Sequence, residues 1–171
     1  MKCILLHGLG QSAASWGDTV KYLGPASDIL CPELSRWLEG CEPRYDNLYC
    51  GLVKYCGQVE GPLNLCGLSL GGILALQYGI EHPERVSSMV LVGTQYTMPK
   101  GLLKFQNALF HLMPKRTFQE MGFKKADFIE LCKSMFDLNF QTGLKQISCP
   151  VLIVCGEKDG ANRAASLQMK E

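Results

Sequence analysis

Residues 63–80 join two apolar segments through a glycine-rich turn. The first, 63–66, is a short run typical of a buried strand, and 67–72 contains three glycines around one serine. The second, 73–80, is apolar on almost every side of the helix that its composition favours. A helix of this kind must be covered all round, because no side of it suits water. The chain must therefore bury this helix against a sheet.

Other segments repeat the alternation of strand and helix. Apolar runs at 3–6, 28–31, 86–92 and 151–155 predict further strands, and the patterns at 15–23 and 46–59 predict helices, the second with Asp46 as its N-cap. Strands that are apolar on both faces indicate a parallel sheet. The expected fold class is α/β: a mostly parallel sheet with helices on both faces.

The rhythm changes between residues 97 and 145. Helical patterns occur at 102–113 and 126–136, with no strand pattern between them. We therefore expect one core made of residues 1–96 and 146–171, with 97–145 as a small helical cap inserted between two strands. A chain of 171 residues is long enough for one such core.

Composition removes several classes of protein. A net charge of +1 gives no electrostatic reason to expect nucleic acid as a partner, and no apolar run reaches the roughly 18 residues of a membrane span. No secretion signal opens the sequence, so a cytoplasmic location is expected. The nine cysteines include no C-x-x-C pair and favour small buried hydrophobes in a reducing compartment over disulfides or a metal site.

The turn itself reads Gly67-Leu68-Ser69-Leu70-Gly71, a G-x-S-x-G. Between a strand and a buried helix, this pattern predicts a sharp turn that exposes the Ser69 hydroxyl at a helix N-terminus, where the dipole favours developing negative charge. The bare pentapeptide has a plainer interpretation, a glycine-rich helix start capped by serine.

Four motifs in order resemble those of the α/β-hydrolase superfamily, and of its small carboxylesterases with a helical cap in particular. They are His7-Gly8-Leu9-Gly10, the Gly-Leu-Ser-Leu-Gly-Gly of 67–72, the His-Pro-Glu-Arg-Val of 82–86, and the segment 149–159 that ends in Gly156-Glu157-Lys158-Asp159. The resemblance covers the chain outside 97–145. The serine turn is also similar to those of haloperoxidase-like and carbon–carbon bond hydrolases, so the resemblance leaves the substrate open.

The resemblance implies a role for four positions. Ser69 is the expected nucleophile, and Asp159 the expected acid, with Glu157 as its competitor. The backbone N–H groups of Leu9 and Leu70 are the expected oxyanion hole. The expected activity is hydrolysis of small or medium acyl esters through an acyl-serine, with no cofactor and no metal.

No histidine follows Asp159, where the family places the base of its triad. His7 is expected to order its loop, and neither His82 nor His111 lies after the acid. Two explanations stay open. Either the sequence is a piece of a longer protein, as its end within a helical pattern favours, or the chain lacks a base and is a catalytically impaired relative or a non-catalytic ligand binder.

The expected cap carries eight Lys or Arg against four acidic residues, a net of +4 that leaves −3 for the rest. Its basic side chains either face water or attract a small ester substrate on an anionic carrier. No pattern indicates an oligomeric state. The residues expected to line the substrate pocket are Trp16, Gln95, Phe105, Leu109 and Met113.

Overall fold

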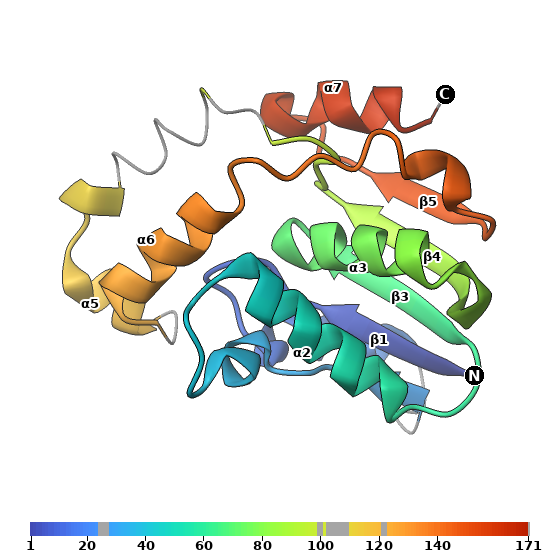
Figure 1. Cartoon of the computed structure of the whole chain (residues 1–171), viewed down its shortest axis with the longest axis horizontal. Coiled ribbons are helices and arrows are strands. Elements are labelled where there is room, and N and C mark those ends of the chain that lie inside the picture. The colour runs from blue at the N-terminus through green and yellow to red at the C-terminus, as the bar shows by residue number, and fades with distance from the viewer. Residues whose placement is uncertain (24–27, 99–100, 102–109, 121–122, 171) are drawn as a thin grey trace.

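A parallel sheet forms the centre of the computed structural model, which describes residues 1–23, 28–98, 101, 110–120 and 123–170 (Figure 1). The described strands pair in the order β2-β1-β3-β4-β5, and every pairing is parallel. Their bounds are β1 (Lys2–Leu6), β2 (Ile29–Leu30), β3 (Leu63–Leu68), β4 (Val86–Val92) and β5 (Val151–Val154). The expected α/β fold with a parallel sheet is confirmed.

Strand β3 lies at the centre of this sheet. Leu6 of β1 is in register with Gly67, and Leu68 is in register with Val92 of β4. The carboxyl ends of three neighbouring strands therefore meet at one edge. Ligands bind at that edge in open α/β sheets, because the connecting loops there diverge and leave a crevice.

The helices follow the expected alternation, with short 3-10 turns between them. The bounds are η1 (Ala13–Trp16), α1 (Gly17–Leu23), η3 (Leu34–Leu38), α2 (Tyr45–Gly57), α3 (Leu70–Glu81), η4 (Pro83–Arg85), α5 (Lys115–Glu120), α6 (Lys125–Ser134), η5 (Leu144–Gln146) and α7 (Gly160–Gln168).

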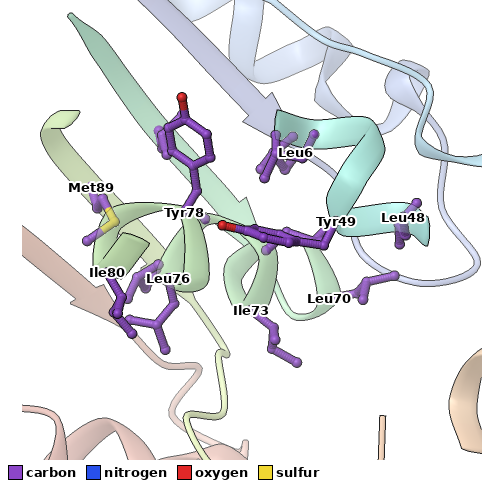
Figure 2. Close-up of a cluster of buried hydrophobic side chains, with 14 of the residues drawn as sticks. Leu6, Leu48, Tyr49, Leu70, Ile73, Leu76, Tyr78, Ile80 and Met89 are labelled. Carbon is purple, nitrogen blue, oxygen red and sulfur yellow. The ribbon is translucent and has the colours of Figure 1, made fainter. Parts of the chain in front are cut away.

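Helix α3 is the helix that the sequence predicts to be covered on all sides. Ten of its 12 residues are buried. Figure 2 shows Ile73, Leu76 and Ile80 of α3 among side chains of β1, α2 and β4. Burying a Leu or Ile side chain stabilises the fold by roughly 1.5–3 kcal/mol, so this helix fixes the position of the turn before it.

The two faces of the sheet differ in how well they are covered. Helices α2 and α3 lie on one face (Figure 1), and Ala165 of α7 belongs to the same buried cluster as Leu65 and Leu91. Residues that alternate with these along the strands, such as Cys66 and Val90, are only half-buried. Helix α1 has no buried residue, although its pattern suggested an apolar stripe.

One cap prediction is wrong. The N-cap of α2 is Arg44, and Asp46 lies inside the first turn of the helix. Arg44 makes no side-chain capping bond. The amide of Tyr45, the first helical residue, instead donates to the Ser134 hydroxyl of α6 at 2.8 Å. A side chain distant in the sequence thus replaces the local cap.

The middle of the segment 97–145 is mainly helical in its described part, and turns follow it at 135–143. It contains α5, α6 and the start of η5, and one isolated antiparallel bridge joins Thr97 to Asn139. Figure 1 shows α5 and α6 on the side toward which the strands point. The helical pattern at 102–113 lies mostly outside the described residues, so the cap and its boundaries stay a prediction.

Candidate active site

Ser69 sits between the last residue of β3 and the first residue of α3, with φ 51° and ψ −109°. It is the one non-glycine residue with positive φ among those described. Such a backbone costs on the order of 1–3 kcal/mol and persists only where the surroundings hold it. One such contact is the hydrogen bond that the Ser69 amide donates to the Val92 carbonyl, at 2.8 Å.

Two glycines allow the chain to approach itself at this turn. A Cβ on Gly71 would lie 2.1 Å from the Leu6 carbonyl oxygen, and one on Gly67 would lie 2.3 Å from the Gly71 oxygen. Real Cβ atoms do not come this close to backbone, so only glycine fits at either position. The sharp strand-to-helix turn expected from the G-x-S-x-G is therefore present.

The loop after β1 lies beside this turn. A Cβ on Gly8 would be 3.4 Å from the Leu68 carbonyl oxygen, directly before Ser69. The next residue is Leu9, which is half-buried and packs against the core. Leu70 opens α3, where N–H groups have no partner within the helix. The two amides expected to form an oxyanion hole thus come from neighbouring segments.

Asp159 is the N-cap of α7. Its Oδ1 accepts from the Asn162 amide at 3.2 Å, and its Oδ2 accepts from Asn162 Nδ2 at 2.7 Å. The same Oδ2 would lie 3.5 Å from a Cβ on Gly93, the residue that follows Val92. The carboxylate is thereby placed beside the end of β4, next to the strand residue that binds Ser69. Nothing comparable holds Glu157, which is exposed.

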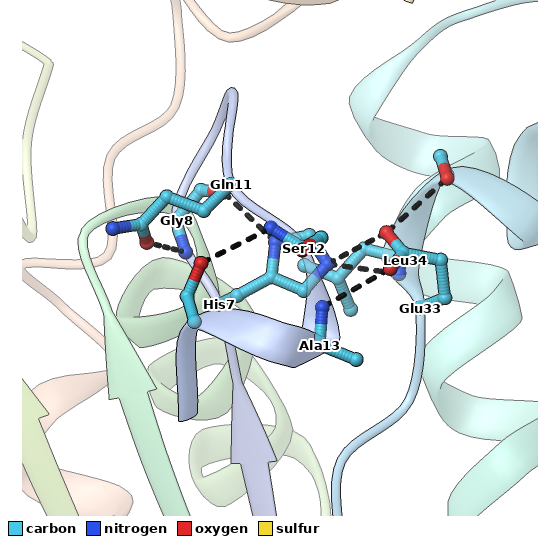
Figure 3. A network of polar contacts seen from close by, with 9 residues as sticks. His7, Gly8, Gln11, Ser12, Ala13, Glu33 and Leu34 are labelled. Atoms are coloured by element: carbon cyan, nitrogen blue, oxygen red, sulfur yellow. Dashed lines mark hydrogen bonds and ion pairs between the residues drawn. The ribbon is translucent and has the colours of Figure 1, made fainter. Parts of the chain in front are cut away.

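The rings of two histidines contact residues other than Ser69. His7 is 2% exposed, and its ring contacts Gly8, Glu33 and Leu34 (Figure 3). His82 stacks on Tyr78 at the far end of α3, with ring centroids 4.5 Å apart. Neither position suits a base for Ser69. His111 lies in the segment between β4 and β5.

The structure places three of the five expected pocket residues. The Trp16 indole N–H is buried without a hydrogen-bond partner among the described residues. Gln95 does not point into open space: its Nε2 donates to the Ala161 carbonyl and to Asn162 Oδ1, both in α7. Met113 packs against the buried pair Phe118 and Phe128. Phe105 and Leu109 lie outside the described residues.

Several hollows lie on the surface of the described residues. One of about 720 Å³ lies between β5 and α7, lined in part by Leu152, Arg163 and Leu167. It opens at the edge of the sheet rather than at the carboxyl ends of the central strands. Among the described residues, no three His, Cys, Asp or Glu side chains are grouped to hold a metal ion, and no helix is long and apolar enough to cross a membrane.

The thiol nearest to Ser69 in the strand is unreactive. Cys66 lies three residues before it, and burial, with a smaller contribution from Cys3, raises the pKa of the Cys66 thiol to about 11. At neutral pH this group is a protonated, small apolar side chain and does not compete as a nucleophile. All nine cysteines are free.

Comparison with known proteins supports one fold family. The model of the alpha/beta hydrolase fold family matches residues 60–126, which include β3, the Ser69 turn and α3. The sheet order and the parallel pairing agree with that family. Together these findings support membership of the α/β-hydrolase superfamily.

Similar proteins in this superfamily include esterases and lipases. A pimeloyl-[acyl-carrier protein] methyl ester esterase of Aromatoleum aromaticum is 31% identical over 91 residues, which are 53% of this chain and 36% of that protein. Monoacylglycerol lipase abhd6-B of Xenopus laevis is 31% identical over 113 residues, 59% of this chain and 33% of that protein. The chain therefore spans about a third of each relative's length.

Solved structures agree on the fold. An enol-lactonase from Burkholderia xenovorans superposes with a TM-score of 0.67 at 15% identity, over 98% of this chain and 78% of the other. A thermophilic esterase from Thermogutta terrifontis gives 0.74 at 16% identity, over 99% and 76%. At these identities the likeness concerns the fold alone.

Sequence reasoning missed two residues around the site, Glu33 and Asn162, and assigned Gln95 to the pocket wall instead of the support of Asp159. Glu33 contacts His7 and Ala13, while Gln95 and Asn162 hold the loop of Asp159. Glu33 directly follows Pro32 at the carboxyl end of a predicted strand. This position was the available signal, because the carboxyl ends of parallel strands meet at one edge.

Proposed function

We propose that this α/β hydrolase is a serine hydrolase that cleaves carboxylic esters through an acyl intermediate on Ser69. The observation that carries the proposal is the backbone of Ser69, strained between a central strand and a buried helix. Strain of this kind clusters at functional sites, because a merely structural serine would relax to an ordinary conformation. The named relatives, an ester esterase and a lipase, support the same reaction class.

In this proposal the Ser69 oxygen attacks the ester carbonyl carbon and loses its proton to a base. The carbonyl oxygen becomes an oxyanion that the amides of Leu9 and Leu70 stabilise, each donor contributing about 3–4 kcal/mol. The leaving alkoxide takes the proton from the base and departs as an alcohol. Water then hydrolyses the acyl ester on Ser69 and releases the carboxylic acid. Asp159 orients the base and stabilises its charged form. His7 and His82 are excluded as that base by their contacts.

The substrate class is small or medium acyl esters, which the relatives' names favour, and a carrier-bound acyl group is one member of that class. The segment 97–145 covers the pocket in this proposal. Gln95 belongs to the support of Asp159 and not to the substrate surface, because its amide is held by α7. Trp16 and Met113 stay candidates for the pocket wall.

Nitrophenyl ester hydrolysis by the complete gene product tests the proposal. Ser69→Ala should abolish turnover and labelling by a fluorophosphonate, with an unchanged unfolding midpoint. Asp159→Asn should keep the cap of α7, because asparagine caps as well as aspartate, and should slow turnover by several orders of magnitude.

The alternative is a ligand binder that keeps the pocket and lacks a base. The rings of His7 and His82 contact other residues, so neither supplies a base for Ser69. Wild-type protein that binds an acyl ester without hydrolysing it, and leaves Ser69 unlabelled, would establish the binder and reject the hydrolase.

A further inference from the structure

Figure 3 shows Glu33 in contact with two points of the loop after β1. Its Oε1 lies 3.1 Å from Nε2 of His7, the residue that starts the loop. Its Oε2 accepts a hydrogen bond of 3.0 Å from the amide of Ala13, which begins η1. One carboxylate from the segment after β2 thus contacts the loop at both of its ends.

Between these two points the loop closes on itself. The Gly8 amide donates to the side-chain oxygen of Gln11 at 2.8 Å, and the Gln11 amide donates back to the Gly8 carbonyl at 3.2 Å. Leu9 and Gly10 form the tip of this turn, and Gly10 has φ 76°. The direction of the Leu9 N–H is therefore set by the two ends that Glu33 holds.

His7 transmits the contact. Its Nδ1 faces the Gly8 carbonyl at 2.9 Å, so Nδ1 carries a proton. Its Nε2 faces both the Glu33 carboxylate and the Leu34 amide, each at 3.1 Å. The ring is thus fixed between the loop and the segment after β2. Because the ring is buried, a lost partner cannot be replaced by water without opening the structure.

We propose that Glu33 is a positioning residue for the oxyanion loop, residues 7–13. It holds the start of the loop through His7 and the end through Ala13, and so fixes the Leu9 amide beside Ser69. The inference rests on the proposed function, because Leu9 matters only if an oxyanion forms there. Oxyanion donors must be in place before the reaction, and displacing one by about 1 Å can cost on the order of 100-fold in rate.

Three variants of the complete gene product separate this role from a general effect on stability. Glu33→Ala removes both contacts. Glu33→Gln keeps the bond from the Ala13 amide, which the amide oxygen accepts, and keeps a polar group at His7 Nε2, to which the amide NH₂ can donate. Ser88→Ala is the control, because it removes a bond of 2.8 Å to Asn64 that lies in the sheet away from the loop.

In nitrophenyl ester hydrolysis we expect Glu33→Ala to lower kcat by about 10- to 100-fold with KM nearly unchanged, because oxyanion bonds strengthen in the transition state. Glu33→Gln should keep most of kcat, and Ser88→Ala should change only the unfolding midpoint. Unchanged kcat in Glu33→Ala, or an equal loss in Glu33→Gln, would overturn the proposal.

Amide hydrogen exchange gives a second readout that needs no activity. The Ala13 and Leu34 amides should exchange faster in Glu33→Ala and at the wild-type rate in Glu33→Gln and Ser88→Ala. If wild-type protein hydrolyses no ester, the proposed function fails, while exchange still decides whether Glu33 holds the loop. Equal exchange in wild type and Glu33→Ala would show that it does not.

Discussion

Gly71 is the residue at which the Ser69 turn tolerates least change. A methyl group there would meet the backbone oxygens of Leu6 and His7 at 2.1 and 2.8 Å. These atoms belong to β1 and its loop and cannot move without breaking sheet pairing. Gly71→Ala should therefore lower the free energy of unfolding by about 3 kcal/mol, as measured by urea denaturation.

Gly57 provides the matched control for that prediction. It ends α2, and a Cβ added there would have no neighbour within 4 Å. Gly57→Ala should stabilise the protein by about 0.5–1 kcal/mol, because alanine loses less backbone entropy on folding. If Gly71→Ala unfolds at the same urea concentration as Gly57→Ala, the close approach of β1 and α3 is not what requires glycine.

The sequence could predict those parts of the site whose residues lie close together along the chain. Ser69, Gly67 and Gly71 form one local pattern, so their turn could be predicted. Glu33 and His7 are 26 residues apart, and no local pattern joins them. Their contact depends on which strand pairs with which, and a periodic apolar pattern fixes strand type without fixing strand neighbours.

Among the elements, α2 and α6 show how a tertiary contact replaces a local cap. The Ser134 hydroxyl accepts from the Tyr45 amide at 2.8 Å and donates to the Leu131 carbonyl at 2.7 Å. The sequence rule placed the cap at Asp46 because it considers only nearby residues. The helix itself was predictable within two residues at each end, since its apolar side repeats at helical spacing.

Ser134→Ala should lower the free energy of unfolding by about 1 kcal/mol, the usual cost of a lost N-cap. Ser134→Thr keeps the hydroxyl and should stay close to wild type. Thermal unfolding of the two variants measures the difference. Equal loss in both would assign the effect to packing at this position and not to the bond with Tyr45.

For the molecule as a whole, the sequence predicted the parallel sheet and the buried helix but not the uneven covering of the two faces. Alternation of strands and helices indicates layers, while the side on which each helix packs depends on the connections. The expectation of buried cysteines fails for Cys41 and Cys50, which are exposed, and holds for Cys56 and Cys132, which are buried. Their burial has a consequence for the stability of the whole fold at alkaline pH.

Burial raises the pKa of the Cys132 thiol to about 12, and raises that of Cys56 to about 12 against the opposing effects of Tyr78 and Arg85. In the unfolded chain these thiols ionise near pH 9. The folded state therefore binds these two thiol protons more tightly than the unfolded chain does. The stability that this difference contributes is fully present below pH 9 and is lost as the pH rises from about 9 to 12.

We expect the urea midpoint of the wild-type protein to fall steadily between pH 9 and 11, with a total loss on the order of several kcal/mol by pH 12. The double variant Cys56→Ala, Cys132→Ala should start lower, because it leaves cavities, and should fall less steeply. Leu131→Ala removes a fully buried neighbour without an ionisable group, so it should start lower and keep the wild-type slope. Identical slopes in all three proteins would mean that other groups cause the alkaline loss.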